Sequence, residues 1–383
     1  MDIDKIRSYF PQFKKVIYFN TGSSGPLPLP VIEEIMRYVD ITKNEGSASP
    51  VLYDEIGKLN LRHKIADFFK VTESEICLTH STSDGLGIVF SGIDWKKGDE
   101  IIAVYPEYIS GMLDCQNIEK QYGVKLKIVR TDEKAFIVEE NIIEEINKKT
   151  KLVLISHINY HNGQKLDCKK ICSSAKEQNA MVIIDGAQSV GAIPVNIKDI
   201  DPDFYVFPAQ KWLLGEEGMG GLYVKKEALN HLKPGRMGYN SVEKFSPSEG
   251  FILHRGARRF EVGTPCSASY FAFSAAIDFY NMIGEEFICS RIEKLVSYLK
   301  EKLSGIKRIH IISPVEKEKS SGLVSFVTQA VDMNTIVTDM YRSKKIIIRS
   351  IPYPECLRVS VHYFNTEKEI DILIEALKGY IYS

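Results

Sequence analysis

The stretch FYVFPAQKWLLGEEGMGGLYV, residues 204–224, decides the fold because it places a lysine between two strand-like runs. FYVF (204–207) and GLYV (221–224) are short, apolar and contain the aromatic and β-branched residues typical of buried strands. Lys211 stands in the glycine-rich tract that joins them. Burying an unpaired ammonium costs several kcal/mol, so Lys211 is either an ordinary lysine at a surface turn or an amine held for chemistry.

Five further apolar runs precede this stretch, and helical patterns separate them. The runs are ICLT (76–79), IIAV (101–104), LKIV (126–129), LVLI (152–155) and MVII (181–184). Helical periodicity places Ile142, Ile143 and Ile146 on one face of a helix, and Ile32, Ile35, Met36 and Val39 on one face of another. Alternation of buried strands with helices predicts an α/β fold with a mostly parallel seven-stranded sheet covered by helices.

The pattern changes after residue 265. A long helix is predicted over 267–287, followed by strands near HIIS (310–313), LVSFV (323–327), KIIIR (345–349) and LRVSV (357–361), and a final helix over 366–381. A chain of 383 residues usually forms two domains. We therefore predict a large domain over 15–265 and a smaller C-terminal α+β domain over 266–383, joined by residues 1–14.

The composition argues against several classes of function. Forty-nine basic and 50 acidic residues give a net charge of −1, so there is no broad electrostatic surface for nucleic acid or an anionic membrane. The charged N-terminus lacks the apolar core of a signal peptide, and no apolar run approaches membrane-spanning length. Seven scattered cysteines show no zinc-type spacing. We expect a cytoplasmic protein with no nucleic-acid or membrane partner and no metal.

Polar residues just past the predicted strands are the first candidates for a site, because ligands gather at the carboxyl ends of parallel strands. Thr82 and Ser83 are expected at a helix N-terminus, where they either bind an anion such as phosphate or simply cap the helix. Tyr105 and Tyr108 follow the strand at 101–104 and offer an aromatic face for a flat ligand.

A carboxylate and an amide follow the strand at 181–184. Asp185 is expected at a mostly buried strand end, where it needs a cationic or proton-donating partner, and Gln188 can donate to the same ligand. A phosphate cup, an aromatic face, a carboxylate and an amine together suit pyridoxal 5'-phosphate. The carboxylate keeps the pyridine nitrogen protonated, and Lys211 holds the aldehyde as a Schiff base and later carries a proton.

Six motifs give the chain a resemblance to a known family. They are YFNTGSSGPLP (18–28), THSTSDGLG (79–87), DGAQSVGA (185–192), QKWLLGEEGMGGLYV (210–224), RRFEVGTP (258–265) and LRVSVHYFNTEKEID (357–371). The chain resembles class V members of the fold-type I pyridoxal-phosphate enzymes, in particular the cysteine desulfurase and isopenicillin N epimerase-like branch. The resemblance runs nearly end to end, and it implies the fold-type I architecture.

The resemblance implies a role for each matching residue. Lys211 corresponds to the Schiff-base lysine, and Asp185 and Gln188 to the partners of the ring nitrogen and the phenolic oxygen. The other implied roles are phosphate binding by Thr82, Ser83 and Gln210, ring stacking by Tyr108, a contact of Thr264 with the neighbouring subunit's phosphate in a homodimer, and binding of the amino-acid substrate's α-carboxylate by Arg358. Arg349 either binds a second acidic group or is a surface arginine.

Some residues depart from the desulfurase pattern. Desulfurases carry a nucleophilic cysteine on a mobile loop shortly before the carboxylate-binding arginine, whereas Cys356 lies only two residues before Arg358 and is expected in a strand. Tyr108 stands where desulfurases stack a histidine. Pro208 replaces a phosphate-binding serine of some relatives. His157 and His161 follow a strand without a carboxylate to complete a metal site, and they are expected near the ring or in a structural role.

Four functions remain open at this point. The leading hypothesis is a class V aminotransferase that deprotonates the substrate's Cα, and the alternative on the same scaffold is a C–S lyase, cysteine desulfurase-like enzyme or epimerase. A nicotinamide-dependent oxidoreductase is a remote alternative, because the glycine fingerprint of such enzymes is incomplete. A non-catalytic relative is disfavoured while Lys211, Asp185 and Arg358 are all present.

Overall fold

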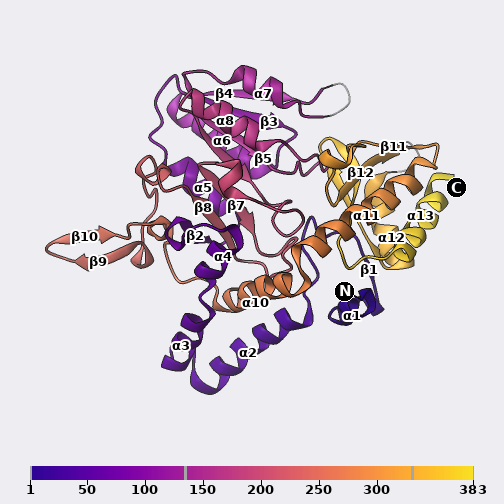
Figure 1. The fold of residues 1–383 in the computed structure, drawn as a ribbon, viewed down its shortest axis with the longest axis horizontal. Coiled ribbons are helices and arrows are strands. Elements are labelled where there is room, and N and C mark those ends of the chain that lie inside the picture. Colours follow the sequence, from indigo (N-terminus) through magenta and orange to yellow (C-terminus); the bar gives the residue numbers. More distant parts are fainter. Residues whose placement is uncertain (1, 133–135, 329–331, 383) are drawn as a thin grey trace.

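A seven-stranded sheet forms the centre of the larger part of the molecule (Figure 1). The structure is a computed structural model that describes residues 2–132, 136–328 and 332–382. The strand order is β2–β8–β7–β6–β5–β3–β4, and only the pairs that involve β8 are antiparallel. The strands are β2 (Ile76–Thr79), β3 (Glu100–Tyr105), β4 (Lys125–Arg130), β5 (Thr150–Ser156), β6 (Met181–Asp185), β7 (Phe204–Pro208) and β8 (Gly220–Val224). All seven predicted strands are confirmed, as is the mostly parallel sheet.

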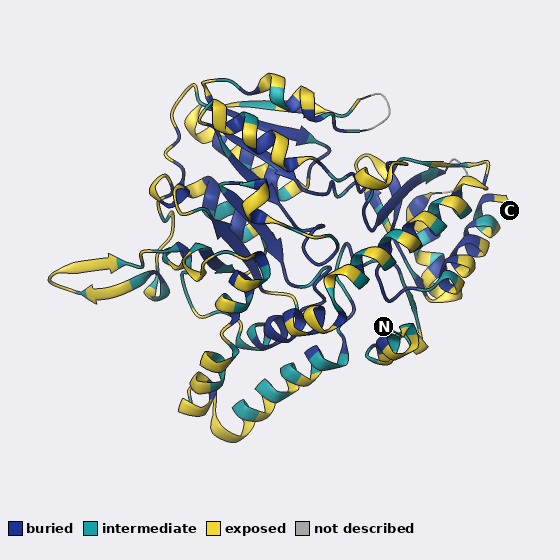
Figure 2. Ribbon diagram, in the orientation of Figure 1, coloured by how far each residue is buried: buried dark blue, intermediate teal, exposed yellow. Residues whose placement is uncertain are grey.

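Hydrophobic side chains cover both faces of this sheet. Along β3, Ile102 and Val104 belong to one core cluster, whereas Ile101 and Ala103 belong to the other, because successive residues of a strand point to opposite faces. The first cluster is completed by α4 (Leu61–Phe69), α8 (Cys168–Glu177) and α10 (Ser267–Ile283), and the second by α5 (Thr82–Gly92) and α6 (Ile109–Tyr122). The strands are accordingly buried between layers of helices (Figure 2).

The C-terminal part contains a four-stranded antiparallel sheet of order β11–β12–β15–β14. Its strands are β11 (Ile309–Ile311), β12 (Leu323–Thr328), β14 (Arg349–Pro352) and β15 (Glu355–Ser360), and its helices are α11 (Glu285–Ser304), α12 (Met333–Lys344) and α13 (Glu367–Tyr382). The run KIIIR does not form one strand. Residues 346–347 form β13 (Ile346–Ile347), which pairs with β1 (Ile17–Tyr18), and β14 begins at Arg349.

The N-terminal residues pack against this C-terminal part. Arg7 of α1 (Ile3–Ser8) forms a bidentate ion pair with Glu369 of α13, and β1 brings residues 17–18 beside β13. The division into 15–265 and 266–383 with 1–14 remains a prediction. Within the described residues, no helix is both long and apolar enough to cross a bilayer.

Two elements lie at the edge of the molecule, outside the large sheet (Figures 1 and 2). The hairpin of β9 (Val242–Ser246) and β10 (Gly250–Leu253) was not predicted, and its Phe245 is 71% exposed. The helix predicted from Ile32 to Val39 is part of α2 (Leu29–Glu45), which is followed by α3 (Pro50–Leu59). On the apolar face predicted for α2, however, Met36 and Val39 are exposed.

The topology of the large sheet fixes where a ligand site belongs. From β3 the chain continues through α6 to β4 on one side, and α7 (Glu139–Glu145) then leads to β5 on the other side of β3. Because neighbouring connections diverge there, a ligand site is expected at the carboxyl ends of β3 and β5. The remaining helix, α9 (Ile197–Ile200), precedes β7.

Candidate active site

Lys211 lies in a tight turn just past the end of β7. The Leu214 N–H donates to the Lys211 carbonyl at 3.1 Å, and the Gly25 N–H donates to the Gln210 carbonyl at 2.6 Å. A Cβ atom on Gly25 would stand 2.4 Å from the Lys211 carbonyl oxygen, so only glycine allows this close approach. The N-terminal loop therefore holds the turn that presents the lysine.

The Lys211 amine lies among three charged residues. Burial lowers the pKa of Lys211 to about 8, Asp185 acts against this shift, and Arg358 and Arg349 reinforce it. Burial raises the pKa of Asp185, while Lys211 and the Ala187 N–H hold it down. The sequence placed Lys211, Asp185 and Arg358 in one site, and the structure brings them together.

Tyr108 provides an aromatic face beside the amine. The Lys211 Nζ lies 5.5 Å from the centroid of the Tyr108 ring, and Tyr160 makes an edge contact with the same ring. Tyr108 is 39% exposed, which leaves a ring surface free for a flat ligand. Tyr105, by contrast, contacts Arg130.

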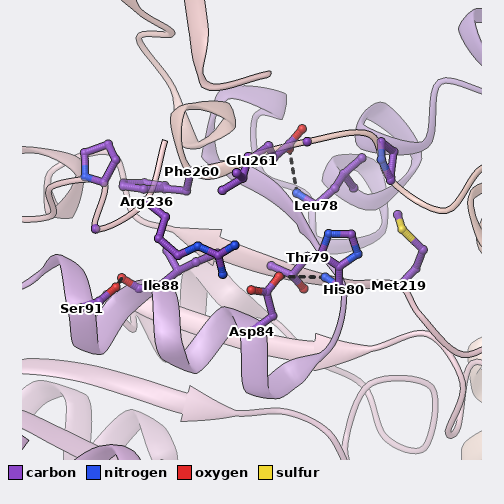
Figure 3. Close-up of a pocket in the computed structure, with 15 residues that line it drawn as sticks. Leu78, Thr79, His80, Asp84, Ile88, Ser91, Met219, Arg236, Phe260 and Glu261 are labelled. Atoms are coloured by element: carbon purple, nitrogen blue, oxygen red, sulfur yellow. Dashed lines mark hydrogen bonds between the residues drawn. The ribbon is translucent and has the colours of Figure 1, made fainter. Parts of the chain in front are cut away.

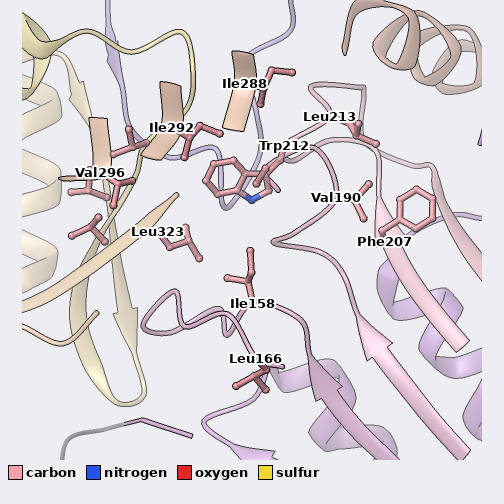
Figure 4. Packing of buried hydrophobic residues seen from close by; sticks show 14 of the residues in the cluster. Ile158, Leu166, Val190, Phe207, Trp212, Leu213, Ile288, Ile292, Val296 and Leu323 are labelled. Atoms are coloured by element: carbon pink, nitrogen blue, oxygen red, sulfur yellow. The ribbon is translucent and has the colours of Figure 1, made fainter. Parts of the chain in front are cut away.

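Trp212 fixes the orientation of Gln188. The Trp212 Nε1 donates to Gln188 Oε1 at 2.9 Å, and because an indole N–H only donates, it selects the oxygen end of the amide. The Gln188 Nε2 consequently donates to the Gly22 carbonyl at 2.9 Å, with one N–H left for another acceptor. Figure 4 shows the Trp212 ring among apolar residues such as Ile288 and Leu323.

The N-terminus of α5 carries polar side chains that are not needed to cap the helix. Ser81 caps this helix, since its hydroxyl accepts from the Asp84 N–H. The simple capping role considered for Thr82 and Ser83 is therefore taken by Ser81. Among the described residues, the Thr82 Oγ1 and the Gln210 Oε1 are buried without a hydrogen-bond partner, whereas the Ser83 hydroxyl donates to the Ser110 hydroxyl.

A small cavity of about 110 Å³ lies beside α5, on the side lined by Asp84 and Ile88 (Figure 3). Arg236 and Phe260 line its other wall. Its lining does not include Lys211, so it is distinct from the site described above.

Two arginines contact the loop that contains Ser23. Arg358 is 2% exposed and donates to the Tyr160 carbonyl at 2.8 Å, and its Nε is buried without a partner in the part of the chain that the structure describes. Burial and the nearby Arg349 lower the pKa of Arg358 to about 10. Exposed Arg349 donates to the Ser23 hydroxyl at 2.7 Å. Both arginines thus face the loop that contains Gly22 and Ser23.

Thr264 is exposed on the surface of the chain, and its hydroxyl contacts the hydroxyl of Tyr239. The role implied for Thr264 concerns a neighbouring subunit, so the structure of one chain does not test it.

The histidines after β5 have protein partners. Burial lowers the pKa of His157 to about 4, and its Nδ1 shares a hydrogen bond with the buried Tyr205 hydroxyl at 2.8 Å. The His161 Nε2 contacts the Pro354 carbonyl. In the part of the chain that the structure describes, no group of three or more histidine, cysteine, aspartate or glutamate residues could hold a metal ion.

Sequence reasoning missed three residues that shape the site. Ser23 accepts hydrogen bonds from both arginines, and Tyr160 makes an edge contact with the ring of Tyr108. Glu107 is buried and directly precedes Tyr108 in the sequence. The only sequence signal was their position: Glu107 and Tyr160 follow strands β3 and β5, and Ser23 lies in the motif YFNTGSSGPLP.

A sequence model of the family "Aminotransferase class-V" matches residues 17–373. The chain belongs to this family. Among curated relatives, a "Probable cysteine desulfurase" from Methanothermobacter thermautotrophicus is 29% identical over 99% of this chain and 98% of the relative. Another from Pyrococcus abyssi is 27% identical, with the same coverage.

Solved structures of the family share the fold closely. C-DES with glycine covalently linked to its PLP cofactor has a TM-score of 0.92 and 27% identity, and the match covers 98% of this chain and 99% of that chain. The complex of the cystine C–S lyase C-DES with cysteine persulfide has a TM-score of 0.91 and 28% identity, with 97% and 99% covered. Apo cysteine desulfurase from Thermococcus onnurineus has a TM-score of 0.91 and 26% identity, with 100% and 99% covered. The fold-type I architecture is confirmed.

The site of this class V protein fits pyridoxal phosphate. The unpartnered Thr82 hydroxyl lies at a helix N-terminus and can donate to a phosphate, whereas Gln210 can donate only through its amide Nε2 and not through the unpartnered Oε1. The unpartnered Arg358 Nε suits a carboxylate. These buried polar atoms would be costly without a ligand, so the residues present match the predicted cofactor and its amino-acid substrate.

Proposed function

We propose that this class V protein is a pyridoxal-phosphate-dependent C–S lyase that cleaves the Cβ–S bond of a cysteine-derived amino acid. The observation that carries this proposal is the state of Cys356. It is buried within β15, and burial raises the pKa of its thiol to about 12. β14 and β15 are joined by a tight turn at Tyr353 and Pro354, which leaves no loop for a mobile cysteine between Arg349 and Arg358. Sulfur would therefore leave on a fragment of the substrate.

The proposed chemistry assigns a task to each group of residues. Pyridoxal phosphate, when bound, supplies an electron sink for the bond broken at Cα. Lys211 removes the Cα proton as a general base, for which its lowered pKa is suited, and Arg358 holds the α-carboxylate. The Cβ–S bond then breaks with its electron pair on sulfur. Addition of water to the remaining fragment yields pyruvate and ammonia.

Other residues hold the cofactor in this proposal. Asp185 keeps the proton on the ring nitrogen, and Tyr108 covers the ring. Thr82, Ser83 and Gln210 bind the phosphate, and Gln188 uses its second N–H for the phenolic oxygen.

In this proposal Arg349 binds a second acidic group of the substrate. Its guanidinium lies beside Arg358 and contacts the same hydroxyl, so a substrate with two carboxylates can engage both arginines. A disulfide of two cysteines has this property. The solved relative described as a cystine C–S lyase supports this choice.

The comparisons favour sulfur chemistry over transamination, since the curated relatives bear the name cysteine desulfurase. A desulfurase would transfer sulfur to an enzyme thiol and release alanine. The test is to supply the purified holoenzyme with cystine or cysteine and to quantify pyruvate, alanine and ammonia. We expect pyruvate and ammonia in equal amounts from cystine. Alanine with a protein-bound persulfide, or one keto acid per site with pyridoxamine phosphate, would contradict the proposal.

A second experiment tests Lys211 itself. Borohydride reduction followed by mass spectrometry should fix pyridoxal phosphate on the peptide that contains Lys211, and the Lys211→Ala variant should retain its fold, by circular dichroism, without any fixed cofactor. A fixed cofactor in that variant would contradict the assignment.

We also propose a cytoplasmic homodimer in which Thr264 reaches the partner's phosphate site. Tyr239, whose hydroxyl contacts that of Thr264, is exposed, and so are Phe245 and Phe251 of the β9–β10 hairpin; exposed apolar side chains are common at interfaces. All seven cysteines are free thiols, as expected in a reducing compartment. Sedimentation equilibrium should give twice the chain mass, and a monomeric holoenzyme would contradict the dimer.

A further inference from the structure

Glu107 is a buried carboxyl group just past the carboxyl end of β3. It is 5% exposed. Its Oε1 accepts from the Ser156 hydroxyl at 2.6 Å and from the Tyr108 N–H at 2.7 Å. Ser156 ends β5, and its register partner in β6 is Asp185. The side chain of Glu107 therefore spans the ends of β3 and β5, next to the strand that carries Asp185.

The two oxygens of Glu107 differ in their surroundings. Oε1 accepts two hydrogen bonds, whereas Oε2 is buried without any partner among the described residues. An ionised carboxylate is an acceptor at both oxygens, and leaving one of them buried and unpaired is costly. A neutral carboxylic acid fits this arrangement better, because its carbonyl oxygen accepts both hydrogen bonds and an unpaired neutral hydroxyl costs less than an unpaired charged oxygen.

The turn that Glu107 stabilises also carries Tyr108. The Asn159 Nδ2 donates to the Pro106 carbonyl at 2.6 Å, so both ends of the dipeptide Pro106–Glu107 are tied to residues at or after the end of β5. We propose that Glu107 is a positioning residue, which as a neutral acid holds Tyr108 in place and leaves Asp185, among the described residues, as the sole negative charge at the ends of β3, β5 and β6.

The groups that face Glu107 support a neutral state. Burial and the negative charge of Asp185 in β6 together raise the pKa of Glu107 to about 7, against the hydrogen bonds from Ser156 and Tyr108. The other titratable neighbours are Tyr160, after β5, and Cys115 of α6. Burial raises the pKa of both of these groups, so they are neutral near pH 7 and Asp185 is the charge that matters.

The experiment compares the holoenzyme with two variants, Glu107→Gln and Glu107→Ala. Infrared difference spectra across pH 5.5 to 8.5 should show a carboxylic acid band that disappears with a midpoint near 7 in the wild type and is absent in Glu107→Gln. The amide of glutamine can still accept from Ser156 and Tyr108, so Glu107→Gln should bind pyridoxal phosphate within about 3-fold of the wild type. Glu107→Ala leaves both donors unpaired and should weaken binding by about 10-fold.

Glu139→Gln is the matched control, because Glu139 is also buried, at 8% exposed, but lies on α7 and accepts from the Asp167 N–H. It should leave both the infrared band near pH 7 and the affinity for pyridoxal phosphate unchanged. Persistence of that band in Glu107→Gln would overturn the proposal. So would wild-type affinity in Glu107→Ala, or an affinity of Glu107→Gln as weak as that of Glu107→Ala. These readouts do not depend on which substrate the enzyme takes.

Discussion

Arg349 and Arg358 stand directly opposite each other in β14 and β15, and both donate to the hydroxyl of Ser23. Like charges at such positions destabilise a sheet, and Arg358 is almost fully buried. A ligand with acidic groups offsets this repulsion. The arrangement therefore supports the proposal that Arg358 binds the α-carboxylate of the substrate and Arg349 binds a second acidic group.

Arg358→Lys should impair every amino-acid substrate. A lysine cannot reproduce the two-pronged contact of a guanidinium, and the loss of charge-assisted hydrogen bonds amounts to about 2 to 3 kcal/mol. We expect a fall in kcat/KM of roughly 30- to 150-fold for cystine and cysteine alike. Steady-state kinetics with both substrates test this, and unchanged kinetics for either would contradict the role of Arg358.

Arg349→Gln should discriminate between the same two substrates. Its loss removes a contact to the second carboxylate of cystine, so we expect the KM of cystine to rise about 10-fold while the KM of cysteine stays within about 2-fold. Equal effects on both substrates would mean that Arg349 acts only through the charge of the site.

Attachment of the cofactor should depend on pH through Lys211. Only the neutral amine attacks an aldehyde, and the pKa of Lys211 lies near 8 because of burial. The rate of pyridoxal phosphate incorporation into the apoenzyme should rise with pH and level off above about 8. Asp185→Asn should move the midpoint to lower pH, because Asp185 raises this pKa. A stopped-flow pH profile measures both midpoints, and a shift to higher pH would contradict the pairing.

The lowered pKa of Lys211 also predicts how the stability of the apoenzyme changes with pH. The folded chain binds fewer protons than the unfolded chain between pH 8 and the ordinary lysine pKa of 10.5. The contribution of Lys211 to the free energy of unfolding therefore increases with pH across this window, by roughly 3 kcal/mol in total, and is lost as the pH falls through 8. Denaturant melts of the wild type and Lys211→Met should converge as the pH rises towards 10.5.

Removal of the Cys356 thiol should leave C–S cleavage intact. Cys356 is enclosed within β15, so Cys356→Ala is expected to change kcat by less than about 2-fold while costing on the order of 1 kcal/mol of stability. Pyruvate release and thermal melts measure the two effects. Cys266→Ser, at the exposed thiol, is the control. Loss of activity in Cys356→Ala without unfolding would point instead to an enzyme persulfide.

The sequence predicted the large sheet and most of the candidate site for one physical reason. The strands are continuous apolar runs, and Asp185, Tyr108 and Lys211 follow them within a few residues, so local patterns were enough. The burial of Glu107 could not be predicted, because Ser156, its partner, lies 49 residues away. The β9–β10 hairpin was missed because its residues are exposed or half-buried and show no core-facing alternation.

The role of Trp212 also depends on such a distant contact, and the second tryptophan of the chain provides a control for it. Trp212→Phe removes the N–H that orients Gln188, and an unpaired buried acceptor costs about 1 to 3 kcal/mol of stability. Trp95→Phe should cost a similar amount, because the buried Trp95 Nε1 donates to the Phe90 carbonyl. Only Trp212→Phe should also weaken binding of pyridoxal phosphate, by about 10-fold, because the side-chain amide of Gln188 then loses its fixed orientation. Denaturant melts and cofactor titrations of both variants separate the effects, and equal cofactor affinities would show that Trp212 contributes packing alone.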